Sequence, residues 1–84
     1  MYKYSDIRPK LFTEEGMEKV LKARDNVAKM IGLSGAATMN NLIKNLYGDS
    51  WLQLACIDYL VEKGEIREVK QVGDVMGQNR IFVK

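Results

Sequence analysis

The stretch that decides the fold is Tyr59-Leu60-Val61-Glu62-Lys63-Gly64-Glu65-Ile66-Arg67-Glu68. Its first half continues an apolar helical pattern that begins at Ser50, and Gly64 is a natural residue to end that helix. After Gly64 the hydrophobic period changes, and residues 65–72 predict a strand, although their alternation is imperfect. The stretch is therefore predicted to join a helix directly to a strand.

Downstream of this junction, the sequence predicts a second strand and hence a hairpin. Residues 73–79 have the loop chemistry of two glycines and an asparagine, and residues 80–84 are rich in β-formers between charged ends. A lone two-stranded hairpin is marginal in water, so this one must pack on helices.

Upstream of the junction, the sequence predicts three helices. The first begins after Thr13, a good N-cap, and ends at Gly32. The second begins after Thr38 and ends at Gly48, and a short edge strand is possible near 35–37. The third covers residues 50–63.

The start of the third helix fits a capping box, with Ser50 as the cap and Gln53 three residues later. Gly48 and Asp49 then form a tight turn between the second and third helices, as a helix-turn-helix requires. Residues 13–84 are predicted to be one domain, preceded by an arm at residues 1–12. The arm has three open roles: packing on the domain, reaching a partner subunit, or touching a phosphate backbone.

The junction resembles that of the winged-helix superfamily. There a leucine of the last helix lies in the core, a glycine ends that helix, and an aliphatic residue two positions later starts the wing. Leu60, Gly64 and Ile66 match those positions. The resemblance implies an α+β winged helix of three helices and a C-terminal two-stranded wing, and it implies DNA binding or protein binding as the function. The runs 48–51, 55–58 and 64–68 are also similar to small uncharacterised proteins of bacteria and phages, which implies no activity.

The composition excludes several classes of protein. The chain has 84 residues, 46% of them hydrophobic and 29% charged, which is typical of one globular domain. No apolar run is long enough for a membrane span and no signal peptide is evident, so a cytoplasmic location is the default expectation. A single cysteine, Cys56, permits no internal disulfide.

Enzyme chemistry is not expected. The sequence has no histidine, no phosphate-binding glycine motif and no acidic residues at metal-ligand spacing. Cys56 lies among apolar residues with no base to activate it. We therefore expect no cofactor, no metal and no small-molecule substrate.

The predicted nucleic-acid contacts follow from the resemblance and from residue chemistry. On the third helix they are Ser50, whose hydroxyl can donate to a phosphate, and Gln53, whose amide suits adenine. The second helix contributes Lys44 and Asn45 as phosphate contacts, and the wing contributes Lys70 and Arg80. However, the third helix has no Lys or Arg before Lys63. Since phosphate contacts dominate DNA affinity, such a helix is an unusual DNA reader.

The third helix also has apolar residues nearly all the way round, which indicates deep burial or an exposed patch for a partner. The candidate partner contacts are Trp51, Leu54 and Tyr59, together with Met76 in the loop. For Trp51, core packing and partner contact both remain open. The partner is a second copy of the chain or another protein.

The sequence therefore predicts a small winged-helix protein that binds double-stranded DNA as a dimer and regulates transcription or mobile-element maintenance. The alternative is a winged-helix protein-interaction module that uses the apolar third helix without binding DNA.

Overall fold

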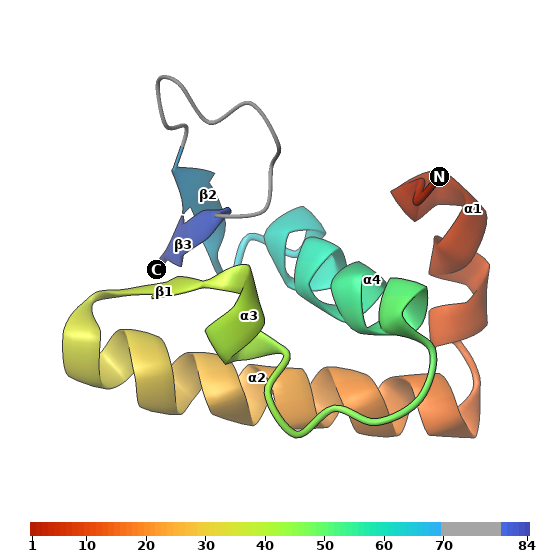
Figure 1. Ribbon diagram of the computed structural model, residues 1–84, viewed down its shortest axis with the longest axis horizontal. Helices are drawn as coiled ribbons and strands as arrows, with labels where there is room; N and C mark the ends of the chain where they lie inside the picture. The colour runs from red at the N-terminus through yellow and green to blue at the C-terminus, as the bar shows by residue number, and fades with distance from the viewer. Residues whose placement is uncertain (70–79) are drawn as a thin grey trace.

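The structure is a computed structural model that describes residues 1–69 and 80–84. Helices and a small antiparallel sheet share one core (Figure 1). The helices are α1 (Tyr4–Ile7), η1 (Arg8–Leu11, a 3-10 helix), α2 (Glu14–Ser34), α3 (Met39–Leu42) and α4 (Ser50–Glu62), and the strands are β1 (Ala36–Thr38), β2 (Arg67–Val69) and β3 (Ile81–Val83).

The predicted α+β class is confirmed, but the expected number of three helices is wrong. The described part of the chain has four α-helices, because a short one forms in the N-terminal arm. The predicted loop at 73–79 and the end of the first wing strand, residues 70–72, lie outside the described residues.

The long helix α2 begins as predicted and ends later than predicted. The Thr13 hydroxyl accepts a hydrogen bond of 3.0 Å from the Gly16 amide, which caps the first turn. The predicted end at Gly32 is wrong, because the helix continues to Ser34. Gly35 takes the left-handed conformation (φ 79°) and donates its amide to the Ile31 carbonyl at 2.7 Å, which closes the helix.

The second predicted helix is much shorter than expected, since α3 ends at Leu42 rather than near Gly48. The Asn26 side chain on α2 donates to the carbonyls of Leu42 and Lys44 at 3.0 and 2.7 Å. Asn45 follows in the left-handed region, with φ 69°. These contacts satisfy the carbonyls that end α3, so the chain leaves the helix there.

The helix α4 begins at Ser50 as predicted and ends at Glu62, one residue earlier than predicted, and it has a different cap. A side-chain oxygen of Asp49, rather than Ser50, accepts from the Trp51 amide at 2.8 Å. The predicted tight turn at Gly48 and Asp49 is also wrong, because the whole segment 43–49 separates α3 from α4. The helix ends before Gly64, which has a positive φ of 76°.

The three strands form an antiparallel sheet in the order β1-β3-β2. The strand that the sequence allowed near 35–37 is present as β1. Phe82 in β3 pairs with Ala37 on one side and Glu68 on the other. The last strand of the chain therefore lies at the centre of the sheet.

The core lies between α2, α4 and the sheet. Leu60 and Phe82 are fully buried and Ile66 is 3% exposed, as the helix–strand junction requires. Ile7 and Leu11 of the N-terminal arm belong to the same core. Of the three roles left open for the arm, packing on the domain is the one found, and burying a leucine contributes about 1.5–3 kcal/mol.

Gly16 provides a test of how tightly the arm packs on α2. A Cβ at Gly16 would lie 2.5 Å from the Leu11 carbonyl oxygen and 2.6 Å from that of Lys10. We expect Gly16→Ala to lower the free energy of unfolding by about 1–3 kcal/mol through this overlap. Urea unfolding measures the change.

The matched control is Gly32→Ala, in the same helix. A Cβ at Gly32 meets no atom within 4 Å. Alanine favours helix over glycine, so this substitution should raise stability by about 0.5–1 kcal/mol. Equal effects of the two substitutions would contradict the packing of the arm against α2.

Candidate functional site

The candidate site lies on the side of α4 that faces the N-terminal arm. Trp51, Leu54, Asp58 and Glu62 follow one another at helical spacing and form one row, here called the outer stripe. The opposite side of the helix carries buried residues such as Leu60. Figure 1 shows α1 beside α4, on the side away from the sheet.

Ion pairs hold the N-terminal arm to the end of the outer stripe. The Arg8 guanidinium donates to both carboxylate oxygens of Glu62, at 2.8 and 2.7 Å. The Tyr4 hydroxyl donates to the same carboxylate at 2.6 Å. The hydrogen bonds from Arg8 and then Tyr4 lower the pKa of Glu62 to about 2. Glu62 is therefore ionised in the folded protein at neutral pH.

The arm also reaches the middle and the start of the stripe. The Tyr2 hydroxyl donates to Asp58 at 2.6 Å. The pKa of Tyr2 is raised, mainly by burial and secondly by this hydrogen bond. The Tyr2 ring lies edge-on to Trp51, with the ring centroids 6.5 Å apart. Trp51 nevertheless stays 42% exposed, so the arm covers it only in part.

Arg80 borders the stripe on the sheet side. Its guanidinium donates to Asp58 at 2.6 Å and to the two oxygens of Glu68 at 3.1 and 3.0 Å. Burial by itself lowers the pKa of Arg80, but the hydrogen bonds to Glu68 and Asp58 outweigh it and the pKa rises. This predicted DNA contact is thus a neutralised link between β2, β3 and α4.

The two predicted base contacts of α4 differ in their surroundings. The Gln53 amide donates to the carbonyls of Leu46 and Gly48, at 2.8 and 3.2 Å, and so holds the segment that leads into α4. Ser50 is exposed on the first turn. Reading adenine with Gln53 would require both of its hydrogen bonds to be given up.

The remaining predicted contacts are scattered. Lys44 and Asn45 are exposed in the segment after α3, where Asn26 holds the Lys44 carbonyl. Lys70 and Met76 lie outside the described residues. The structure therefore brings Arg80 beside the outer stripe and places Lys44 and Asn45 on a different segment.

The predicted partner contacts fall on two sides of α4. Leu54 is half-buried on the outer stripe. Tyr59 is five residues further on, which turns its side chain about 140° away. Its ring packs edge-on to Phe12 at 5.8 Å, and the Lys63 ammonium lies 5.6 Å from its centroid.

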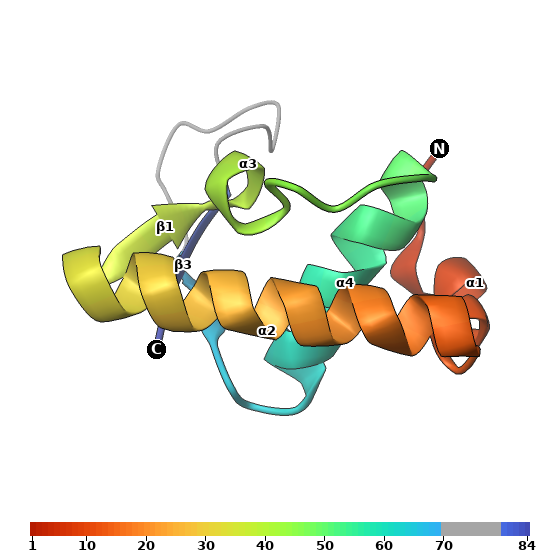
Figure 2. The same cartoon turned by 90° about the horizontal axis from the view of Figure 1, so that it is seen from below.

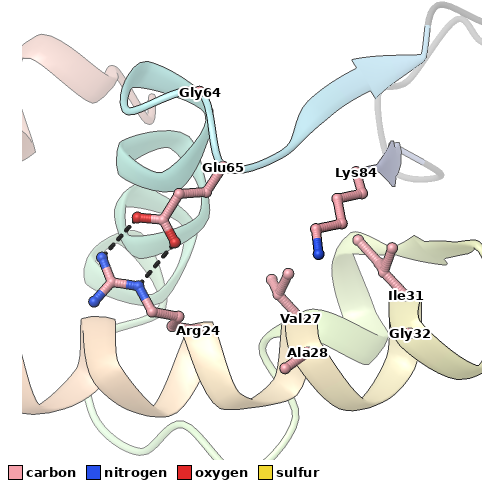
Figure 3. Close-up of a pocket in the computed structure, with 8 residues that line it drawn as sticks. All are labelled: Arg24, Val27, Ala28, Ile31, Gly32, Gly64, Glu65 and Lys84. Carbon is pink, nitrogen blue, oxygen red and sulfur yellow. Dashed lines mark hydrogen bonds and ion pairs between the residues drawn. The ribbon is translucent and has the colours of Figure 1, made fainter.

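A pocket of about 480 Å³ opens between α2 and the junction after α4 (Figure 3). Val27 and Ile31 contribute apolar lining, and the Lys84 side chain extends over them. Arg24 and Glu65 close one end with a bidentate ion pair, whose two hydrogen bonds are 2.8 and 2.7 Å long. None of the predicted contacts within residues 1–69 and 80–84 lines this pocket.

The described residues were also compared with the requirements of a metal site, a reactive cysteine and a membrane-spanning helix. Among residues 1–69 and 80–84, no group of three or more His, Cys, Asp or Glu side chains is placed to hold a metal ion. Burial raises the pKa of the Cys56 thiol to about 11, which disfavours the reactive thiolate. In the same ranges, no helix has the length and apolar character to cross a membrane.

Sequence reasoning missed the residues that frame the stripe. Tyr2, Tyr4 and Arg8 contact carboxylates more than fifty positions away in the chain. The only local signal was the pair Asp58 and Glu62, which at four residues apart share one side of a helix. That pattern indicates an acidic edge without identifying which cations meet it.

A scan against protein-family models finds no matching family, and searches of curated proteins and of solved structures find no match either.

The Glu62 ion pair predicts a pH-dependent contribution to stability. Because folding lowers the pKa of this carboxylate from 4.5 to about 2, its contribution is present above pH 4.5 and is lost as the pH falls toward 2. We expect Glu62→Gln to destabilise the protein at pH 6, and the difference from wild type to shrink across that range. Urea unfolding followed by the fluorescence of Trp51, the single tryptophan, measures it.

Glu18→Gln is the control, since Glu18 is an exposed carboxylate on α2. Its effect on the free energy of unfolding should be small. If the two variants show the same pH dependence, Glu62 does not hold the arm.

Proposed function

We propose that this chain is a winged-helix module that binds another protein through the outer stripe of α4. The order of α2, β1, α3, α4, β2 and β3 supports the winged-helix assignment. So does the sheet order, in which the strand after the first long helix joins the edge of the C-terminal hairpin strands. The fold alone permits either DNA or protein as the partner.

The observation that carries the proposal is the exposure of Trp51 within a frame of ion pairs. Trp51 is 42% exposed beside the half-buried Leu54. Tryptophan is enriched among residues that dominate binding energy, and such residues are typically surrounded by polar groups that exclude water. Here Asp58 and Glu62, with their tyrosine and arginine partners, supply that polar surround.

The charges on this surface favour a protein over DNA. The stripe itself carries two carboxylates, and the arginines beside it, Arg8 and Arg80, are already paired with carboxylates. A phosphate would have to compete for each arginine, and hydrogen bonds to charged groups contribute about 1.5–3 kcal/mol. A protein partner needs no such exchange, because it can cover Trp51 and leave the ion pairs at the rim.

The test is a comparison of Trp51→Ala with wild type. Because the side chain is partly exposed, the substitution should cost less than the about 3–5 kcal/mol typical of a buried tryptophan. It should also abolish complex formation, either self-association measured by sedimentation or binding to a purified partner measured by calorimetry. The urea midpoint shows that the variant is folded.

Leu33→Ala is the matched control, since Leu33 is 88% exposed at the end of α2, in a different part of the molecule. The Leu33→Ala variant should form complexes with the same affinity as wild type. Complexes that survive Trp51→Ala, or that are lost equally in both variants, would rule out the stripe as the binding surface.

Double-stranded DNA is the second candidate partner, with regulation of transcription or of a mobile element as the role. The observation that favours it is the exposure of Lys44 and Asn45 on the segment that precedes α4. In a helix-turn-helix, this region lies against the phosphate backbone. Ser50, on the first turn of α4, is also exposed.

Under the DNA proposal, Lys44→Gln removes one phosphate contact. Duplex affinity should fall, and the slope of log affinity against log salt should become shallower by about 0.9. Fluorescence anisotropy with a labelled duplex measures both quantities. If wild type shows no duplex binding at low salt, double-stranded DNA is excluded as a partner and the protein-binding proposal is unaffected.

A further inference from the structure

Tyr47 is an aromatic residue that the fold holds in place without burying it. Its neighbour Leu46 is 6% exposed and belongs to the core, whereas Tyr47 is 73% exposed. The Gln53 amide holds the carbonyls on both sides of it, those of Leu46 and Gly48. The backbone is therefore anchored at each side of a side chain that faces solvent.

The surroundings of Tyr47 contain lysines together with carboxylates. The segment that carries it runs along α2 (Figure 2), and the Lys22 ammonium on that helix lies 5.4 Å from the Tyr47 ring centroid. Asn26, one turn further along α2, binds the Lys44 carbonyl at 2.7 Å. This contact places the Lys44 backbone close to the same side of α2.

Tyr47 also forms one wall of a pocket of about 330 Å³, which is close to the lower end of small-molecule sites. Its other lining residues are Leu46, Glu18, Lys19 and Lys22. Lys19 is paired with Glu15 at 2.9 Å. The pocket thus combines an aromatic face, an apolar residue, ammonium groups and a carboxylate.

From this geometry we propose that the Tyr47 pocket binds one nucleotide of a single-stranded nucleic acid, with the base on the tyrosine ring and the phosphates at Lys22 and Lys44. An exposed aromatic ring beside lysines is the usual chemistry for single strands, because bases stack on the ring and ammonium groups follow the backbone. The Glu18 carboxylate repels phosphate and accepts N–H donors, so the base rather than the phosphate faces it. A duplex is a poorer ligand, since its bases are already stacked.

This site is independent of the protein-binding surface proposed above. It is built from α2 and the segment between α3 and α4, and it does not include the outer stripe. Either proposal can therefore fail without the other.

The experiment is fluorescence anisotropy of the full chain with a labelled ten-nucleotide single strand at low salt. Tyr47→Ala should weaken binding about tenfold, which corresponds to losing about 1.4 kcal/mol of base stacking. Tyr47→Phe keeps the ring and should bind like wild type. Because Tyr47 is exposed, both variants should keep the wild-type urea midpoint.

The lysines are tested by the double variant Lys22→Gln with Lys44→Gln. Removing two phosphate contacts should weaken binding and reduce the salt slope by about 1.4. Lys63→Gln, at the far end of α4 from Tyr47, is the control for lost charge and should leave the slope nearly unchanged.

Several results would overturn the proposal. These are no single-strand binding by wild type at low salt, unchanged affinity of Tyr47→Ala, or an equal effect of Lys63→Gln and the double variant. Tighter binding of a duplex of the same length would contradict stacking on Tyr47. Equal affinity for a free mononucleotide would assign the pocket to small nucleotides instead of a strand.

Discussion

The arrangement of the whole domain depends on the short strand β3. It has three residues, Ile81–Val83, and both other strands pair with it. Phe82 at its centre is fully buried. Because β1 and β2 do not pair with each other, removing β3 would leave both without a partner in the sheet. The strand that arrives last in the sequence therefore joins the chain before α3 to the chain after α4.

This constraint also fixes how α4 is presented. One side of the helix packs on α2 and the sheet, and the N-terminal arm packs on another side, where Ile7 and Leu11 add to the core. An amphipathic helix covered on one side needs a single apolar stripe, whereas a helix covered on two sides needs more. The nearly continuous apolar surface of α4 follows from this double coverage. What remains uncovered in part is the short row that contains Trp51 and Leu54.

The features that local chemistry decides were predictable from sequence. Thr13 caps a helix, Gly64 ends one, and Leu60 and Ile66 are buried where the junction requires. The end of α2 and the cap of α4 were each misplaced by one to a few residues, whereas the prediction for α3 failed because a distant side chain holds its carbonyls. The end of α3 depends on Asn26, a residue of another helix. No propensity of residues 39–47 contains that information.

In the candidate site too, some features follow from local sequence and others depend on residues far away in the chain. The apolar excess of α4 predicts either deep burial or an exposed patch, and Trp51 is 42% exposed. The status of Arg80 was not accessible, because its carboxylate partners Asp58 and Glu68 lie 22 and 12 residues earlier. The sequence gives the charge of each residue, but the tertiary structure determines which charged residues form ion pairs.

Because of these ion pairs, the arginines and the lysines of this protein have different roles. Arg8, Arg24 and Arg80 each direct a guanidinium fork onto both oxygens of a glutamate. Arginine suits planar, bidentate recognition, whereas lysine acts as a point charge on a flexible stem. Here these three arginines hold the arm, the junction and the sheet together, whereas the fourth arginine, Arg67, is exposed on β2. Surface lysines such as Lys22 and Lys44 can attract a backbone without reading its bases. We therefore propose that specificity comes from shape and aromatic contact, at Trp51 for a protein and at Tyr47 for a base.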